Sequence, residues 1–293
     1  MSAMAAMPAT TQSPKHGASS RGDHAYDGTH SCEKECLPRS ARRTESIVRY
    51  GDLLAARSRC LQPQHLKDTS GRMQLIRYRW SGSPSWHPFR VGIFAGIHGD
   101  EQSGVLAAMQ LLQHLEWNPR IAEYYELFIY PVCNPWGFDE VRRESNSGKD
   151  LNRCFWQDDE EPEVRFLEQD LRSKNFDGII SLHTDDTSEG IYGYANGSTL
   201  TRHLLEPALR SASAVLPRDL RTHIDTHPAC ESIIDGGYQG ILSAPADQSP
   251  QPFQIVFETP HLAALTQQVD AHLIVLREIL AQYRKISSEG RDI

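Results

Sequence analysis

Five short apolar runs, each rich in β-branched and aromatic residues, predict β-strands in the chain after Arg72. They are MQLIRYRW (73–80), VGIFAGI (91–97), YELFIYPV (125–132), DGIISLH (177–183) and FQIVFE (253–258). Between them, apolar positions recur every three to four residues, as in helices, over 101–116, 161–174, 199–215 and 260–284. The predicted buried face of the last helix comprises Leu262, Leu265, Val269, Leu273, Leu276 and Leu280. The alternation predicts an α/β fold, a single domain with a mixed, mostly parallel twisted sheet and helices on both faces.

The first 45 residues have a different character. Residues 1–45 are rich in Ser, Thr, Ala, Gly, Pro and His and show neither a strand nor a helix period, which predicts a flexible tail before a domain over 46–293. Cys32 and Cys36, with His30 beside them, are metal-ligand types, but no second spaced pair accompanies them. We therefore interpret them as incidental thiols.

Composition excludes several classes of protein. The chain has 293 residues, of which 39% are hydrophobic and 23% charged, as in ordinary globular proteins. Its 38 acidic residues exceed its 30 Lys and Arg, so no overall basic surface supports nucleic-acid binding. The sequence contains neither an apolar run of about 18 residues nor the apolar core of a secretory signal. Together with the low count of six cysteines, this predicts a cytoplasmic protein without a membrane partner.

The first candidate for chemistry is His98-Gly99-Asp100-Glu101, which directly follows a predicted strand and precedes a predicted helix. Ligands of parallel sheets bind beyond the carboxyl ends of the strands, so His98 and Glu101 can hold one metal ion there. The same His-x-x-Glu spacing occurs in the predicted tail and inside a predicted helix (His30/Glu33 and His203/Glu206). Only the pair at the strand end has a context that favours a metal site.

Two further strand ends extend this site. His183 ends the strand 177–183 and completes a His₂Glu set, the ligands of a catalytic zinc ion with a position open for water; alone, it would be read as a structural residue. Glu258 ends the strand 253–258 and is the candidate general base. The alternative role for Glu258 is to cap a helix that begins near Pro260.

The segment NPWGFDEVRRESNSGKDLNR (134–153) concentrates cationic side chains. It carries Arg142, Arg143 and Arg153, the last next to Asn152. Guanidinium groups beside an amide suit the bidentate capture of a carboxylate, and the alternative is a solvated basic loop.

HGDE, NPWG, RESNSGKDLNR, SLH and FETP follow one another along the chain and resemble the zinc carboxypeptidase family that includes carboxypeptidase A. The likeness is greatest to short bacterial members without a pro-segment, and it spans about residues 73–284. It implies a carboxypeptidase-like fold and a catalytic domain over 46–293. It also implies one Zn²⁺ ion held by His98, Glu101 and His183.

The resemblance implies further roles for residues around this ion. Asp150 would orient a ligand imidazole, and Asn152 with Arg153 would hold the substrate's terminal carboxylate. Arg143, or Arg142 if the register slips by one residue, would stabilise the oxyanion. Glu258 would be the general base and later the proton donor. Tyr238 would be the tyrosine that the family carries on a mobile loop.

The expected activity is that of a metallocarboxypeptidase that hydrolyses a C-terminal peptide bond. Alternatives are an N-acyl amino-acid amidohydrolase of the related succinylglutamate desuccinylase and aspartoacylase type, an amidase of cell-wall peptides, and an inactive zinc-binding module. The acylases carry a further β-rich domain after the catalytic Glu, whereas 35 residues, read mainly as one helix, follow Glu258. The expected partner is thus a peptide or N-acyl amino acid with a free carboxylate, and residues 239–252 are expected to line the specificity pocket.

Overall fold

The computed structural model describes residues 42–67, 74–82, 87–197 and 200–289. Most of the predicted tail, with His30, Glu33, Cys32 and Cys36, lies outside the described residues. A first helix, α1, begins at Arg43, within the last three residues of the segment predicted as tail.

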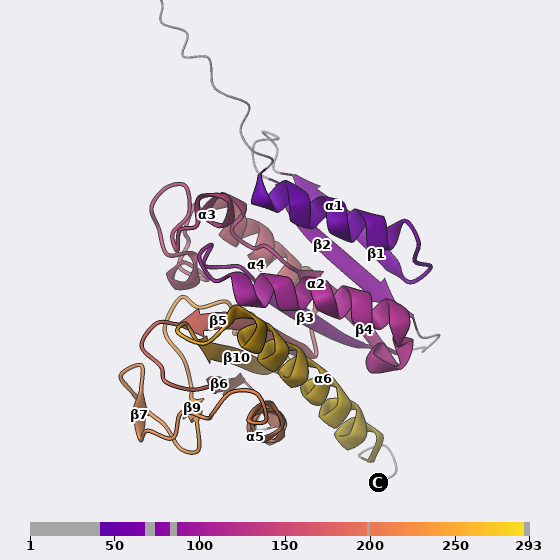
Figure 1. Cartoon of the computed structure of the whole chain (residues 1–293). Coiled ribbons are helices and arrows are strands. Elements are labelled where there is room, and N and C mark those ends of the chain that lie inside the picture. Colours follow the sequence, from indigo (N-terminus) through magenta and orange to yellow (C-terminus); the bar gives the residue numbers. More distant parts are fainter. Residues whose placement is uncertain (1–41, 68–73, 83–86, 198–199, 290–293) are drawn as a thin grey trace, which may run out of the picture. The chain divides into compact units, whose positions relative to one another are not determined.

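An eight-stranded sheet with the order β1-β2-β4-β3-β5-β10-β6-β9 forms the centre of the fold (Figure 1). Four neighbouring pairs are parallel (β4/β3, β3/β5, β5/β10 and β6/β9) and three are antiparallel. The strands are β1 (Leu61–Lys67), β2 (Gln74–Ser81), β3 (Phe89–Ala95), β4 (Tyr125–Tyr130), β5 (Gly178–Asp185), β6 (Tyr192–Gly197), β9 (Ile233–Asp235) and β10 (Phe253–Pro260). A separate small hairpin pairs β7 (His223–Ile224) with β8 (His227–Pro228). The predicted mixed, mostly parallel sheet is therefore confirmed.

Helices cover both faces of the sheet, as the sequence predicts. They are α1 (Arg43–Ala55), α2 (Gln102–Trp117), α3 (Pro135–Glu140), α4 (Pro162–Lys174), α5 (Leu200–Ala212) and α6 (Leu265–Glu289), with short 3₁₀ turns at Pro119–Ala122 and Leu151–Arg153. The apolar sides of α2, α5 and α6 share one core cluster with the sheet. The apolar side of α4 packs in a second cluster against the phenylalanines of the other face. None of the helices in the described part of the chain is both long and apolar enough to cross a membrane.

All five predicted strands and all four predicted helices form, with shifted ends. The largest shift is in the last helix, which is α6 and begins at Leu265 instead of residue 260. Leu262 and Leu265, both predicted on its buried face, are 91% and 44% exposed, whereas Val269, Leu273, Leu276 and Leu280 are buried as predicted. The buried face therefore starts later along the chain than the apolar period suggests.

The arrangement of β3, β5 and β10 positions the candidate site. These three strands are consecutive parallel neighbours in the sheet, so their carboxyl ends meet at one edge. Their buried, largely apolar residues anchor them in the middle of the molecule. The chemistry-bearing residues that follow or end these strands are thereby held by a rigid scaffold.

Candidate metal centre and its cavity

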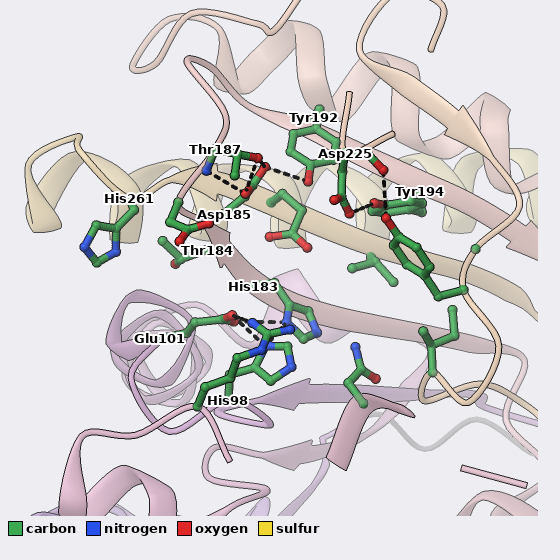
Figure 2. A pocket seen from close by; sticks show the side chains of 18 of the residues that line it. His98, Glu101, His183, Thr184, Asp185, Thr187, Tyr192, Tyr194, Asp225 and His261 are labelled. Atoms are coloured by element: carbon green, nitrogen blue, oxygen red, sulfur yellow. Dashed lines mark hydrogen bonds and ion pairs between the residues drawn. The ribbon is translucent and has the colours of Figure 1, made fainter. Parts of the chain in front are cut away.

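His98, Glu101 and His183 converge at the sheet edge (Figure 2). The first two lie on either side of the corner between β3 and α2, where Glu101 is the residue that precedes the helix. His183 lies in β5, the strand next to β3. All three side chains are buried, and one ligand atom of each lies within 4.8 Å of the others.

Each imidazole turns Nδ1 toward a shared point and uses Nε2 for a hydrogen bond elsewhere. His98 Nδ1 lies 2.6 Å from Glu101 Oε1, and His183 Nδ1 lies 3.0 Å from Glu101 Oε2. The two Nδ1 atoms are only 3.3 Å apart. On the far sides, His98 Nε2 lies 3.1 Å from Asp150 Oδ1 and His183 Nε2 lies 2.8 Å from Ser181 Oγ. Such outer partners orient metal-binding imidazoles, so this donor set fits a divalent ion such as Zn²⁺.

The charges of Glu101 and His183 also suit a cation. Burial acts to raise the pKa of Glu101, but the two histidines outweigh it and lower that pKa, so the carboxylate stays ionised. Burial lowers the pKa of His183, which favours the neutral, metal-binding form of its ring. Burial acts in the same direction on His98, but Glu101 and Asp150 outweigh it and raise its pKa to about 9.

Gly99 lets the corner pack tightly on the segment that begins with Asn134. A Cβ atom at Gly99 would lie 1.9 Å from the carbonyl carbon of Gly137 and 2.2 Å from the nitrogen of Phe138. Asn134 caps α3, because its Oδ1 accepts a 2.9 Å hydrogen bond from the nitrogen of Gly137. The HGDE and NPWG motifs are therefore two sides of one contact that fixes the turn between His98 and Glu101.

Arg143 and Asp150 form a charged bridge beside the metal ligands. Arg143 donates hydrogen bonds of 3.2 Å from Nε and 3.0 Å from Nη2 to Asp150 Oδ2, and its Nη1 lies 3.6 Å from Glu101 Oε1. Its neighbour Arg142 is exposed and does not line the cavity. Of the two arginines that the resemblance left open, Arg143 is therefore the one that reaches the site. Arg143 is 41% exposed but pairs with two carboxylates of the site, Asp150 and Glu101.

Asn152 and Arg153 follow in a 3₁₀ turn that Asp150 caps through a 2.9 Å bond from the nitrogen of Asn152. Asn152 is buried, and its Oδ1 accepts a 2.9 Å hydrogen bond from the nitrogen of Leu242. The Arg153 guanidinium lies 4.4 Å above the ring of Tyr238. Sequence-distant residues are thus joined into one wall.

Glu258 lies beside the metal ligands at the same edge of the sheet. It lies in β10 directly beside His183 of β5 in the parallel register, and it is partly buried. Burial raises the pKa of Glu258 well above its ordinary value, and neighbouring carboxylates, foremost Glu101, raise it further. The alternative role as a helix cap is wrong, because α6 begins only at Leu265.

One cavity of about 500 Å³ collects these residues. Eight of the nine predicted site residues line it, namely His98, Glu101, Arg143, Asn152, Arg153, His183, Tyr238 and Glu258. The ninth, Asp150, contacts both His98 and Arg143 from outside the lining. The structure therefore brings all nine together, although the prediction for 239–252 is largely wrong: within that stretch, Ile241 alone lines the cavity.

Sequence reasoning missed a second wall of this cavity. Tyr192 and Tyr194 project from one side of β6, and Asp185 and Asp225 face them (Figure 2). Tyr192 donates a 3.0 Å hydrogen bond to Asp185 Oδ2, and Tyr194 donates one of 2.6 Å to Asp225 Oδ2. Tyr192 and Tyr194 stand at positions i and i+2, so they share one face of a strand, and this pattern could have indicated β6. The hairpin residue Asp225 carries no comparable sequence signal.

A sequence model of the succinylglutamate desuccinylase/aspartoacylase catalytic domain matches residues 89–227. This span contains the three candidate ligands and the Asn152–Arg153 pair, and it ends before Tyr238 and Glu258. No curated protein matches the chain in sequence.

Several solved structures are similar to this chain. A candidate metallopeptidase from Shewanella denitrificans OS217 superposes with a TM-score of 0.69 at 20% identity, over 82% of this chain and 90% of that one. Another from Shewanella baltica OS155 gives 0.66 at 21% identity, over 80% and 89%. A metallo-carboxypeptidase from Pseudomonas aeruginosa, in complex with (2-guanidinoethylmercapto)succinic acid, gives 0.63 at 16% identity, over 83% and 69%. The fold is that of the zinc carboxypeptidases, as the sequence motifs imply.

Proposed function

We propose that this chain, which combines a zinc carboxypeptidase-like fold with a buried His-Glu-His metal centre, is a zinc-dependent metallocarboxypeptidase. The observation that carries the proposal is that a single cavity holds the metal ligands, the Glu258 carboxylate and the two arginines Arg143 and Arg153. A carboxypeptidase needs all three elements: a metal, a base and a cationic group that holds the substrate's terminal carboxylate.

The bound zinc would act as a Lewis acid and polarise the scissile carbonyl. Glu258 would take a proton from the attacking water on its carboxylate and then pass it to the nitrogen of the leaving amino acid. Its raised pKa supports the first step, because a carboxylate with an elevated pKa is a stronger base. The raised pKa of Glu258 thus fits the proposed transfer of a proton from the water to this carboxylate.

Two cationic groups would act on two different parts of the substrate. Arg143 is fixed by Asp150 and lies beside Glu101, so its guanidinium is already oriented at the metal site, where it would stabilise the developing oxyanion. Arg153 would pair with the terminal carboxylate, assisted by the Asn152 amide. The ring of Tyr238 packs against the Arg153 guanidinium and lines the same cavity. We propose that Tyr238 is the mobile-loop tyrosine that the family resemblance implies.

An N-acyl amino-acid amidohydrolase is the second candidate, because the matching family model describes that catalytic domain. The charge of the cavity favours the peptidase. Six carboxylates line it against two arginines, and they belong to Asp100, Glu101, Asp185, Asp186, Asp225 and Glu258. N-acetyl-aspartate and N-succinyl-glutamate carry two and three carboxylates, so this lining would repel them more strongly than a peptide with one terminal carboxylate.

The test is a substrate panel assayed with zinc-loaded protein and with protein stripped by a chelator. The panel contains peptides with different C-terminal residues, N-acetyl-aspartate, N-succinyl-glutamate and a cell-wall muropeptide. Zinc-dependent release of a C-terminal amino acid from the peptides supports the proposal. Release from the N-acyl amino acids alone overturns it in favour of the amidohydrolase, cleavage of the muropeptide alone favours the cell-wall amidase, and silence on every substrate favours an inactive zinc-binding module.

A further inference from the structure

Asp225 occupies a strained position at the tip of the small hairpin. The two-residue turn between β7 and β8 consists of Asp225 and Thr226, with φ values of 46° and 65°. Turns of this kind favour Asn and Gly, because positive φ crowds the side chain of other residues, and a β-branched residue such as Thr is a marked outlier. The strained turn presents the Asp225 carboxylate to the cavity (Figure 2). Such strain is concentrated at functional positions.

The Asp225 carboxylate is not neutralised by the protein. Tyr194 donates a 2.6 Å hydrogen bond to its Oδ2, and among the residues that the structure describes it forms no ion pair. By contrast, the nearby Asp185 accepts hydrogen bonds from the nitrogen and Oγ1 of Thr187 and from Tyr192. Asp225 is therefore a lining carboxylate that one neutral donor, the Tyr194 hydroxyl, holds in place, and it has no cationic partner among the described residues.

Aromatic rings form the wall that includes Tyr194, the hydrogen-bond donor to this carboxylate. The ring centroids of Tyr192 and Tyr194 are 5.8 Å apart, those of Tyr194 and Tyr238 are 6.2 Å apart, and His227 lies edge-on to Tyr238 at 4.4 Å. Ring faces attract ammonium and guanidinium groups, and a carboxylate at the end of an aromatic wall adds direct charge pairing. An apolar side chain would cover the Asp225 carboxylate without supplying a cationic partner.

The contact chain also places Asp225 next to the proposed carboxylate-binding end. Arg153 lies 4.4 Å above the Tyr238 ring, and the Tyr238 hydroxyl donates a 2.7 Å hydrogen bond to the backbone oxygen of Asp225. A single tyrosine therefore separates Arg153 from Asp225. The substrate residue whose carboxylate pairs with Arg153 is the residue whose side chain can reach Asp225.

We infer that Asp225 is a specificity-determining residue that selects a cationic side chain, an ammonium or a guanidinium group, on the C-terminal residue of the substrate. This inference rests on the proposed carboxypeptidase function. Tyr194 fixes the carboxylate, and the tyrosine wall encloses the methylene stem of the selected side chain. The two arginines of the cavity remain assigned to the terminal carboxylate and the oxyanion.

The test uses peptides that are identical except for a C-terminal Lys, Arg, norleucine or Glu. Norleucine has the stem of Lys without its ammonium group, so it isolates the charge. We expect kcat/KM for Lys or Arg to exceed that for norleucine by about tenfold or more, and comparison of Lys with Arg distinguishes the two cations. The Asp225→Asn variant should lose this preference through lower kcat/KM for Lys and Arg, with norleucine changed by less than about twofold.

Asn suits the left-handed turn at least as well as Asp and keeps an acceptor for Tyr194, so this variant should fold and bind zinc normally, which its melting temperature and metal content check. Asp186→Asn is the matched control, because it removes the same charge from an exposed position on the cavity rim. Equal cleavage of norleucine and Lys by the wild type, or an equal loss on all peptides in Asp225→Asn, overturns the inference alone. Cleavage of none of the peptides overturns the proposed function and the inference together.

Discussion

Glu258 and His183 are direct register partners on the adjacent parallel strands β10 and β5. Side chains in register on neighbouring strands point to the same face of a sheet, so the candidate base and a candidate metal ligand are held side by side by the backbone ladder. Their spacing depends on the sheet and not on a loop. The proposed mechanism needs such an arrangement, because Glu258 and the metal held by His183 would have to act on one water molecule.

The Glu258→Gln variant should keep its metal and lose its turnover. The amide has nearly the same size as the carboxylate but cannot accept a proton, so kcat should fall by about 10²–10⁴-fold. Metal analysis beside steady-state kinetics checks both halves of this expectation. A variant with wild-type kcat would remove Glu258 from the mechanism, and loss of zinc would instead make Glu258 a metal ligand.

The Asp150→Asn variant should weaken metal binding although Asp150 is not among the three ligands. Its carboxylate holds His98 through Nε2 and also fixes Arg143. Loss of such an outer partner commonly lowers metal affinity about 10–100-fold. Competition with a chromophoric chelator measures the zinc Kd. An unchanged Kd would show that the contact with His98 does not support the metal site.

The Gly99→Ala variant should damage both the fold and the metal site. Its added methyl group would overlap the backbone of Gly137 and Phe138, which cannot give way as a flexible side chain can. We expect a loss of about 1–3 kcal/mol in the free energy of unfolding. Because Gly99 separates His98 from Glu101, zinc content should fall as well. Denaturant unfolding that matches the wild type would show that α3 moves away at no cost.

His272 of α6 should make the protein less stable in acid. It is fully buried, and burial, together with the charge of His183, lowers its pKa to about 3, whereas the unfolded chain has the ordinary value of 6.5. The unfolded state therefore binds the proton more readily, so the stability that neutral His272 contributes is complete above about pH 6.5 and is lost as the pH falls toward 3.

Comparison with His272→Gln isolates this effect, because the metal ligands are the same in both proteins. His272 Nε2 lies 3.1 Å from Ser103 Oγ, and a Gln side chain can replace that hydrogen bond. Denaturant unfolding between pH 7 and pH 4 should show a steeper loss of stability in the wild type, by up to about 1.4 kcal/mol per pH unit. Parallel curves for the two proteins would contradict the prediction.

The centre of the fold was predictable because its strands are almost continuously apolar. β3, β4 and β5 are buried parallel neighbours, and buried strands in such sheets leave a strong sequence signal. The edge strand β1 (LQPQHLK) is largely polar and contains a proline, so its sequence does not indicate a strand. Its pairing with β2 decides its conformation.

The metal ligands were predictable for a related reason. His98 and His183 belong to the ends of strands with strong signals, and parallel strands bring their carboxyl ends together. Asp225 could not be found in this way, because it enters the cavity from a two-residue turn without Asn or Gly. Its neighbours Tyr194 and Tyr238 come from other parts of the chain. Only the folded contacts show that they share one wall.

The most direct test of the account is the titration of metal-stripped protein with zinc while the release of a C-terminal amino acid from a peptide is measured. The account predicts that activity is absent after stripping, rises in proportion to added zinc, and reaches its plateau at one equivalent. It also predicts that His183→Ala does not recover under the same conditions, because it lacks one of the three ligands. Full activity of the stripped protein, or full recovery of His183→Ala at one equivalent, would contradict the account.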